Sequence, residues 1–322
     1  TEIERGTGTF RHAPAYIAAG GPPLDPLNQP VNDQPHETAA NGGLSGVLAD
    51  AGPDSWGKRI LTNLHPRTMA NATELDVLLL AGGHGIGALL FSGSGTSVKA
   101  RPDGIALKDI GAAAEAAHQV EMGQVLREQL REIMNAGTSL GGMHPKVAVT
   151  REDGSAWIAK FRGHEDTIDT PRVELAAMRL ARDCGIDTAE VQPTAIGERV
   201  ALLVRRFDRG ASDLHYASAH ALWNRARANP NTYQEWASYA GIAELRRKLP
   251  GGEVRADLEE LYRRLVFNVV IGNTDDHGPN HGFLMDAAGH WRLSPAFAVL
   301  LTDQPGDESW PIAGATFILM YK

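Results

Sequence analysis

A short polar stretch behind a strongly apolar helix is the feature that most constrains this chain. Residues 272–281 combine four ionisable side chains with glycine and proline. Residues 258–271 before them predict a helix that Gly272 ends, and residues 282–293 after them predict a short hairpin. The polar stretch is therefore mounted between a buried helix and a small sheet, a rigid support for chemistry. The apolar residues that recur at helical spacing and predict the buried face are Leu258, Leu261, Leu265, Val266 and Val269.

The spacing inside the polar stretch suggests a particular chemistry. Asp275 and Asn280 are separated by the D-x-x-x-x-N interval of protein-kinase catalytic loops. In that chemistry the aspartate accepts a hydroxyl proton and the asparagine holds a magnesium ion. Asp, Asn, Gly and Pro are also the commonest turn formers, so an ordinary turn is the alternative. The upstream sequence decides between the two.

A lysine in an apolar strand supports the kinase interpretation. Lys160 belongs to a predicted hairpin over residues 146–161, where an ammonium group must reach solvent or find an anion. It resembles the strand lysine of kinases, which pairs with phosphate oxygens and with a helix glutamate. Glu174 is the candidate partner, at the edge of the apolar face of a helix that begins after residue 169. A first-turn glutamate also complements the helix dipole, which is the simpler interpretation.

The order of the other segments also agrees with a kinase. Residues 137–142 form a glycine-rich stretch whose N–H groups can cradle phosphate, although a flexible hinge is the simpler interpretation. Predicted strands near residues 190–192 and 200–204 lead to Arg206 and Phe207, where we expect a hinge to a helical lobe. We therefore predict an α+β, two-lobed protein-kinase-like fold with an added N-terminal subdomain.

Composition narrows the remaining classes of function. The chain has 322 residues, a net charge of −8 and a single cysteine, Cys184. The acidic balance argues against generic nucleic-acid binding, and one cysteine fits a reducing cytosol. No stretch of about eighteen apolar residues occurs, so we expect no membrane span.

A glycine cluster in the N-terminal part suggests a rival class of enzyme. Gly83, Gly85 and Ala88 match the G-x-G-x-x-A variant of the dinucleotide fingerprint of nicotinamide-dependent oxidoreductases. That fingerprint needs a helix to begin at the glycines. Residues 92–95, Ser-Gly-Ser-Gly, break such a helix, so we predict a hairpin strand and regard the match as coincidental. Residues 107–135 predict one long helix that connects two modules.

In combination, the motifs of this chain resemble the HipA family, the bacterial serine/threonine kinases of type II toxin–antitoxin modules. The resemblance spans nearly the whole chain, and the motifs together are highly specific. They lie at residues 46–50, 53–57, 139–142, 145–146, 157–161, 173–174, 204–209, 273–277, 280 and 293–297.

The resemblance implies an N-terminal subdomain over residues 1–105, a kinase N-lobe over 106–209 and a helical C-lobe over 210–322, incomplete at its C-terminus. It implies ATP and Mg²⁺ as cofactors and phosphate transfer to Ser or Thr in the cytoplasm. The implied partner is a HipB-like helix-turn-helix antitoxin, with DNA contacted only through it and no membrane. The implied substrate is a translation factor such as an aminoacyl-tRNA synthetase.

The same matching assigns roles to individual residues. Asp275 is the expected catalytic base and Asn280 the expected magnesium ligand. Ser139 is the expected site of autophosphorylation. The residues expected to bind ATP are Ser139, Gly141, Gly142, Lys160, Glu174, Arg206 and Phe207.

One position departs from the family pattern. The family carries Pro-x-Tyr-Asp after the hairpin, and its aspartate binds magnesium, whereas residues 295–298 here are Pro-Ala-Phe-Ala. Ala298 cannot bind a cation. Either the chain is naturally degenerate or the aspartate has been replaced by engineering, which we favour. We therefore expect the chain in this form to be nearly inactive.

Two further classes of function stay open. A pseudokinase that only binds its antitoxin agrees with Ala298. A metal-dependent hydrolase is the other, because Asp275, Asp276, His277 and His281 are close enough in sequence to bind zinc. Gly278 and Pro279 separate the two histidines, so these cannot form the helical pair of H-E-x-x-H.

Overall fold

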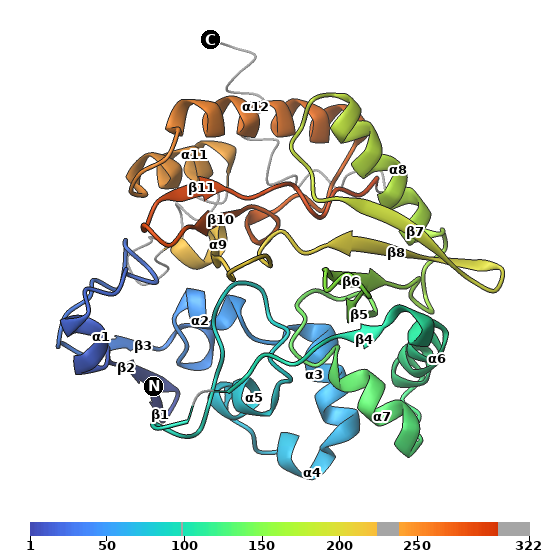
Figure 1. Ribbon diagram of the computed structural model, residues 1–322, viewed down its shortest axis with the longest axis horizontal. Helices are drawn as coiled ribbons and strands as arrows, with labels where there is room; N and C mark the ends of the chain where they lie inside the picture. The colour runs from blue at the N-terminus through green and yellow to red at the C-terminus, as the bar shows by residue number, and fades with distance from the viewer. Residues whose placement is uncertain (98, 224–237, 302–322) are drawn as a thin grey trace.

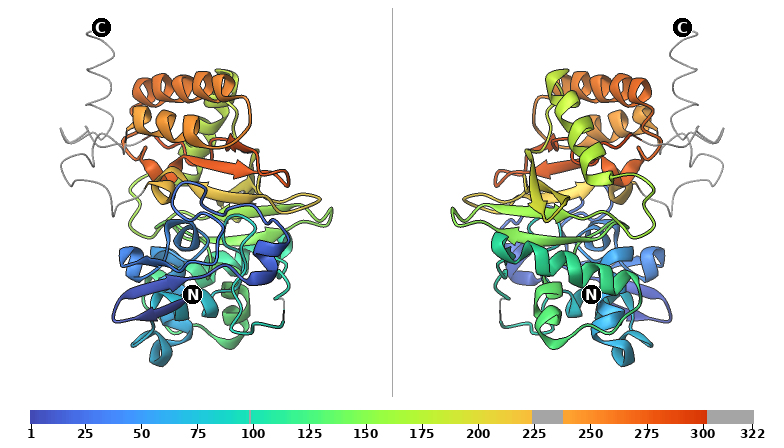
Figure 2. Two further views of the ribbon diagram at one scale, coloured as in Figure 1. Left: turned by 90° about the vertical axis from the view of Figure 1, so that its left-hand side faces the viewer. Right: turned by 90° about the vertical axis from the view of Figure 1, so that its right-hand side faces the viewer.

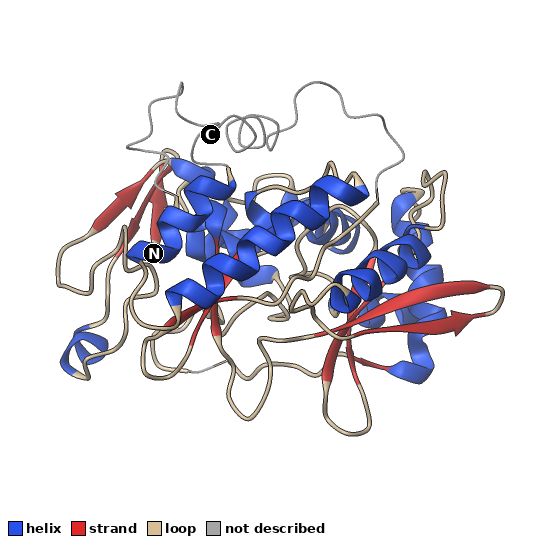
Figure 3. Ribbon diagram, turned by 90° about the horizontal axis from the view of Figure 1, so that it is seen from above, coloured by secondary structure: helices blue, strands red, loops and turns tan. Residues whose placement is uncertain are grey.

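All named strand pairs of the described chain except one are antiparallel, and helices pack around the sheets, which defines an α+β fold. The computed structural model describes residues 1–97, 99–223 and 238–301. Within these residues the strands form three separate sheets, with the helices packed around them (Figure 3). Figure 1 shows the N-terminal helices on one side of the molecule and α11 and α12 on the opposite side. The side views in Figure 2 show the same two-tiered arrangement.

The N-terminal region combines a small antiparallel sheet with short helices. The strand order is β1-β2-β3, and Gly8 of β2 pairs with Ile3 and with Thr38. Its elements are β1 Glu2–Glu4, β2 Thr7–Phe10, α1 Pro14–Ala18, β3 His36–Thr38, η1 Ala40–Gly42, α2 Gly46–Asp50, α3 Ser55–Leu64, α4 Pro66–Met69 and α5 Glu74–Leu80.

A five-stranded sheet follows the N-terminal region in sequence, in the order β4-β5-β6-β8-β7. Only the β4–β5 pair in this sheet is parallel. The predicted hairpin and the two strands after it are confirmed as β5 to β8. The elements of this region are β4 Ile105–Ala106, η2 Leu107–Asp109, α6 Ile110–Glu121, α7 Glu128–Asn135, β5 Lys146–Thr150, β6 Ala156–Lys160, α8 Thr170–Asp183, β7 Val191–Ile196 and β8 Arg199–Arg205.

The prediction of one helix over residues 107–135 was wrong. The chain forms α6 and α7 with a break between them, where Gly123 adopts a left-handed conformation with φ +66°. Both helices pack on α3. Trp56 and Ile60 of α3 share a buried core with Val147 and Trp157 of the sheet. The N-terminal region and the sheet are therefore joined by a common core.

The C-terminal region contains the apolar helix and hairpin that the sequence predicts. Helix α12 ends at Gly272, which adopts the left-handed conformation with φ 68°. Strand β10 pairs with β11 as expected and also with β9, so the small sheet has a third strand. The elements are β9 His215–Ser218, α9 Ala219–Leu222, α11 Tyr239–Lys248, α12 Val254–Ile271, η4 Gly278–Asn280, β10 Gly282–Met285 and β11 Trp291–Leu293.

The predicted buried face of α12 was only partly right. Leu261 and Leu265 are buried, but Val266 is 45% exposed. Polar side chains take part of the buried face instead, because they satisfy one another there. Arg264 Nε donates to Glu260 Oε1 over 2.9 Å, and Arg264 NH2 donates to the Ser294 carbonyl over 2.8 Å. Apolar periodicity cannot reveal such a buried ion pair.

Candidate functional site

The end of strand β6 brings a lysine and a glutamate together. Along β6, Trp157 and Ala159 point into the core, so Lys160 lies on the opposite, half-buried face. Helix α8 begins at Thr170 with Pro171 in its first turn, and this places Glu174 one turn in. Lys160 Nζ lies 2.5 Å from Glu174 Oε1, with the two side chains only 20% and 11% exposed. The strand and the helix thus hold one ammonium group in a fixed place.

A second lysine lies beside this pair and reaches the glycine-rich loop. Lys146 is the direct cross-strand neighbour of Lys160, and its Nζ donates to the Gly141 carbonyl over 2.7 Å. Burial, and then the charge of Lys160, lower the pKa of Lys146 to about 7. Gly142 follows with φ +89°, a conformation that favours glycine. Sequence reasoning placed Lys146 in the strand but gave it no role.

Ser139 is buried in this conformation. Its side chain lies in the loop at 2% exposure. Its Oγ accepts a hydrogen bond from the N–H of Gly83, over 2.7 Å. Ser139 must therefore leave Gly83 before its hydroxyl can receive a phosphate, and its autophosphorylation stays a prediction.

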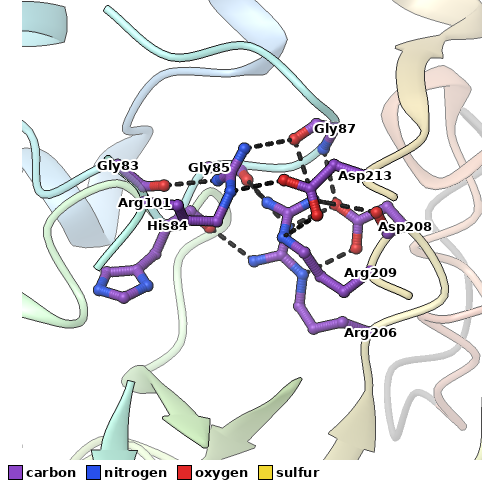
Figure 4. A network of polar contacts seen from close by, with 9 residues as sticks. All are labelled: Gly83, His84, Gly85, Gly87, Arg101, Arg206, Asp208, Arg209 and Asp213. Atoms are coloured by element: carbon purple, nitrogen blue, oxygen red, sulfur yellow. Dashed lines mark hydrogen bonds and ion pairs between the residues drawn. The ribbon is translucent and has the colours of Figure 1, made fainter. Parts of the chain in front are cut away.

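Arg206 at the predicted hinge faces the N-terminal region (Figure 4). Its guanidinium donates to the carbonyls of His84 and Gly85 and to both carboxylate oxygens of Asp208. Arg209 NH1 donates to Asp208 Oδ2 and to the Gly87 carbonyl. The guanidinium of Arg206 already donates to these three residues, so a contact with ATP would have to be made in addition to them or in place of one of them. That contact stays a prediction.

This network also explains the glycine cluster of the N-terminal region. Helix α5, not a strand, precedes Gly83 and Gly85, and neither a helix nor the expected hairpin strand follows them. The segment is a loop whose carbonyls are acceptors for Arg101, Arg206 and Arg209. A Cβ at Gly85 would lie 2.0 Å from the Ala51 carbonyl oxygen. The dinucleotide fingerprint is thus a coincidence, and the glycines serve close packing.

Phe207 packs against the segment that carries Ala298. Its ring centroid lies 5.5 Å from that of Phe297 and 6.4 Å from that of Tyr216. The predicted hinge is thereby in contact with the residues that follow β11. Its role in binding ATP stays a prediction.

The polar loop after α12 presents Asp275 to solvent. Asp275 N–H donates to Asn273 Oδ1 over 3.2 Å, a local turn that the Asx residues make possible. Asn280 Nδ2 donates to the Asp275 carbonyl over 2.6 Å. His277 Nε2 lies 3.5 Å from Asp275 Oδ1. The two residues of the predicted catalytic interval are therefore held together, with the Asp275 side chain 63% exposed.

Asp276, the next residue of this loop, is buried and forms hydrogen bonds to three other residues. His281 Nε2 lies 2.7 Å from Asp276 Oδ1. Tyr239 Oη and Asn268 Nδ2 donate to Oδ2 over 2.6 and 2.8 Å. Burial alone would raise the pKa of Asp276, but these three partners outweigh it and hold the pKa below its usual value. Asp276 thus has partners on both of its oxygens and supports the loop, whereas Nδ1 of His281 is buried without a hydrogen-bond partner among the described residues.

Among the described residues, neither a zinc site nor a kinase-type magnesium site is complete. In the described part of the chain, no three His, Cys, Asp or Glu side chains come together to hold a metal ion. The hydrolase hypothesis therefore has no geometric support in these residues. Asn280 and Ala298 line one cavity with Asp276 and His281. Asn280 offers one neutral oxygen and Ala298 none, whereas magnesium prefers carboxylate ligands.

The geometry on both sides of the hinge is that of a kinase-like α+β protein. Comparisons with known proteins name the family. The model of the HipA N-terminal domain matches residues 1–92, and that of the HipA-like C-terminal domain matches residues 138–317, more than half of the chain. The chain belongs to the HipA family.

Individual relatives match only part of this chain. The putative kinases Y4mE and Y4dM of Sinorhizobium fredii are each 30% identical to this chain, over 161 and 165 residues. These matches span 45% and 46% of this chain but only 34% and 38% of the relatives, so the chain matches little more than a third of their length.

A solved structure covers the chain more fully. HipA of Shewanella oneidensis MR-1, in a complex with HipB and operator DNA, matches with a TM-score of 0.66 and 19% identity. The match covers 95% of this chain and 74% of that one. The predicted two-lobed α+β fold with an added N-terminal subdomain is thereby confirmed. No helix among the described residues is long and apolar enough to cross a membrane.

Proposed function

We propose that this chain is the ATP-binding toxin kinase of a toxin–antitoxin module, built to phosphorylate Ser or Thr. The observation that carries the proposal is the contact of Lys160 with Glu174, at 2.5 Å between β6 and α8. It occurs upstream of the Asp275–Asn280 loop, in the order that kinases use. The HipA family membership supports the same function.

The residues divide the work as follows. Lys160, with Gly141 and Gly142, would hold the phosphates of ATP, and ATP supplies the transferable γ-phosphoryl group. Asp275 would accept the proton of the attacking hydroxyl. The new bond forms between that oxygen and the γ-phosphorus, the bond to the β-phosphate oxygen breaks, and ADP leaves.

The chain as it stands is proposed to bind ATP and transfer little phosphate. Charge develops on the phosphoryl oxygens during transfer and normally needs a metal to neutralise it. Because Ala298 offers no ligand, the metal site is incomplete. A pseudokinase that only binds its antitoxin is the second candidate function, and Ala298 is the observation that favours it.

The proposed partner is a HipB-like antitoxin, because the similar HipA of Shewanella is found with HipB and operator DNA. The chain would then contact DNA only through the antitoxin. The proposed substrate is a translation factor, with an aminoacyl-tRNA synthetase as the first candidate, and the proposed location is the cytoplasm. Co-expression with small helix-turn-helix proteins, followed by size-exclusion chromatography, tests the partner.

Titration calorimetry with ATP and Mg²⁺ tests nucleotide binding. Lys160→Ala removes the proposed phosphate-binding cation and should weaken binding at least about tenfold, because charge-assisted contacts to phosphate are strong. Lys248→Ala is the matched control. Lys248 forms an ion pair with Glu244 at 3.4 Å within helix α11, which supplies no residue to the proposed ATP site, and its loss should leave ATP binding unchanged. Equal affinities for wild type and Lys160→Ala would refute the assignment.

Repair of the metal site tests catalysis. Ala298→Asp should switch on autophosphorylation at Ser139, measured by mass spectrometry after incubation with ATP. Adding Asp275→Ala to the repaired protein should switch it off again. Phosphate on Ser139 of the unrepaired chain, produced in cells without another copy, would contradict the proposal that Ala298 disables transfer.

A further inference from the structure

The N-terminal region touches the glycine-rich loop with a carboxylate. Asp54 is the residue before α3 and accepts the N–H of Ser55, the first residue of that helix. Its second oxygen, Oδ2, accepts the N–H of Gly142 over 3.1 Å. The next residues reinforce this contact. Trp56 N–H donates to the Gly142 carbonyl over 3.1 Å, and Trp56 Nε1 donates to the Lys146 carbonyl over 2.8 Å.

The other end of the loop is held by the same region. Thr138 Oγ1 accepts the N–H of Gly82 over 2.8 Å, and Ser139 Oγ accepts the N–H of Gly83 over 2.7 Å. The glycine-rich loop is therefore fixed at both ends by a region that lies before it in sequence. At the end of the loop where we expect phosphate to bind, the N–H of Gly142 donates to Asp54, whose carboxylate is exposed.

Charge makes the Asp54 contact significant. Burial would raise the pKa of Asp54, but the N–H groups of Ser55 and Gly142 and the nearby Lys146 outweigh it and lower the pKa, so Asp54 is ionised at neutral pH. A loop N–H with a lysine beside it is the environment in which proteins hold phosphate. Here a carboxylate of the protein itself occupies that environment.

We propose that Asp54 occupies the place of a nucleotide phosphate on the Gly142 N–H, so that the N-terminal region sets the affinity of the loop for ATP. The inference rests on the proposed function, because it concerns the same nucleotide site. Other charged groups near Lys146 are Lys160 and Glu174, and these already form a pair with each other. Asp54 is thus the anion that an entering phosphate must displace.

Asp54→Asn tests this without removing the start of α3. Asparagine caps helices as well as aspartate does, so the fold should be kept while the negative charge is lost. The matched control is Asp76→Asn. Asp76 lies in the first turn of α5 in the same region, where its side chain accepts the Thr73 N–H over 2.8 Å and takes part in the capping of α5.

The ligands are ATP with Mg²⁺ and adenosine, which has no phosphate, titrated into the full chain by calorimetry. Removing one negative charge a few ångströms from a bound phosphate should tighten ATP binding about fivefold. Adenosine affinity should stay unchanged, and Asp76→Asn should match wild type for both ligands. A loop that was merely loosened would weaken ATP or change both ligands alike.

The other outcomes separate a failure of this inference from a failure of the proposed function. If wild type binds ATP and Asp54→Asn binds it equally or more weakly, the inference is wrong while the proposed function stands. The inference is also wrong if Asp54→Asn changes adenosine binding as much as ATP binding. If wild type and both variants keep their melting temperatures yet bind no ATP, the proposed function itself fails, and the inference fails with it.

Discussion

Asp208→Ala is expected to destabilise the joint between the N-terminal region and the hinge by about 3 kcal/mol. The carboxylate is 2% exposed and accepts from Arg206, from Arg209 and from the N–H of Gly87. The two arginine side chains are themselves only 5% and 9% exposed. Removal of the acid leaves Arg206 buried without a counter-charge and leaves Arg209 with only Asp213, at 3.7 Å. The loop carbonyls still accept from them, which keeps the cost at the lower end of the usual range for such pairs.

Urea unfolding at pH 7 measures this cost, and Asp213→Ala is the matched control. Asp213 forms ion pairs with Arg101 at 2.7 Å and with Arg209 at 3.7 Å, but its side chain is 32% exposed. Water screens such a pair, so its loss should cost under about 1 kcal/mol. A cost for Asp208→Ala no larger than that for Asp213→Ala would refute the claim that burial makes this network matter.

The pH dependence of the same protein gives an independent check. Burial would raise the pKa of Asp208, but Arg206 and Arg209 outweigh it and lower the pKa to about 2. A group whose pKa is depressed in the folded state contributes stability above its unfolded pKa, near 4, and loses it as pH falls towards 2. The wild type should lose about 2 kcal/mol over this window relative to Asp208→Ala. Parallel pH profiles of the two proteins would contradict the assignment.

Two further predictions concern a histidine of the same network and a pair of glycines outside it. Burial, and then Arg206, Arg101 and neighbouring cations, lower the pKa of His84 to about 4, so wild type should lose up to about 3 kcal/mol relative to His84→Gln as pH falls from 6.5 to 4. A constant difference between these two proteins in urea unfolding would be the contrary result. Gly46→Ala should cost about 2 kcal/mol, because a Cβ there would lie 2.3 Å from the Ala221 carbonyl oxygen. Gly111→Ala in α6 meets nothing within 4 Å and should stabilise by about 0.5–1 kcal/mol; equal effects of the two alanines on thermal unfolding would overturn this reasoning.

Most of the helices and strands that the sequence predicted follow from local patterns. The end of α12 at Gly272 and the hairpin of β10 and β11 follow from periodicity and turn formers, which act between neighbours in the chain. The break between α6 and α7 was missed because Gly123 lies inside an otherwise helical pattern. The left-handed backbone of that glycine ends α6.

The candidate site likewise contains contacts that the sequence could predict and contacts that it could not. Lys160 and Glu174 could be paired from sequence, because a charged residue in an apolar strand needs a partner and a helix glutamate follows closely. The commitment of Arg206 to the carbonyls of His84 and Gly85 could not, because about 120 residues separate the partners and a carbonyl has no sequence signature. The burial of Asp276 with His281 escaped for a related reason, since nothing in the loop sequence tells which aspartate faces inward.

The arginine contacts in Figure 4 have a consequence for how this protein can diverge. Three arginines, Arg101, Arg206 and Arg209, donate to main-chain oxygens of the loop at residues 83–87. Every amino acid supplies such an oxygen. Drift at Ile86 therefore leaves the docking intact, whereas Gly85 is fixed by its closeness to the Ala51 carbonyl. Selection on this network should therefore fall on the arginines, on Asp208 and on the tightly packed Gly85 and Gly87. An N-terminal region from a diverged homologue should therefore dock by its backbone at this network, but it must still supply the side chains that Trp56 and Ile60 contribute to the core shared with Val147 and Trp157.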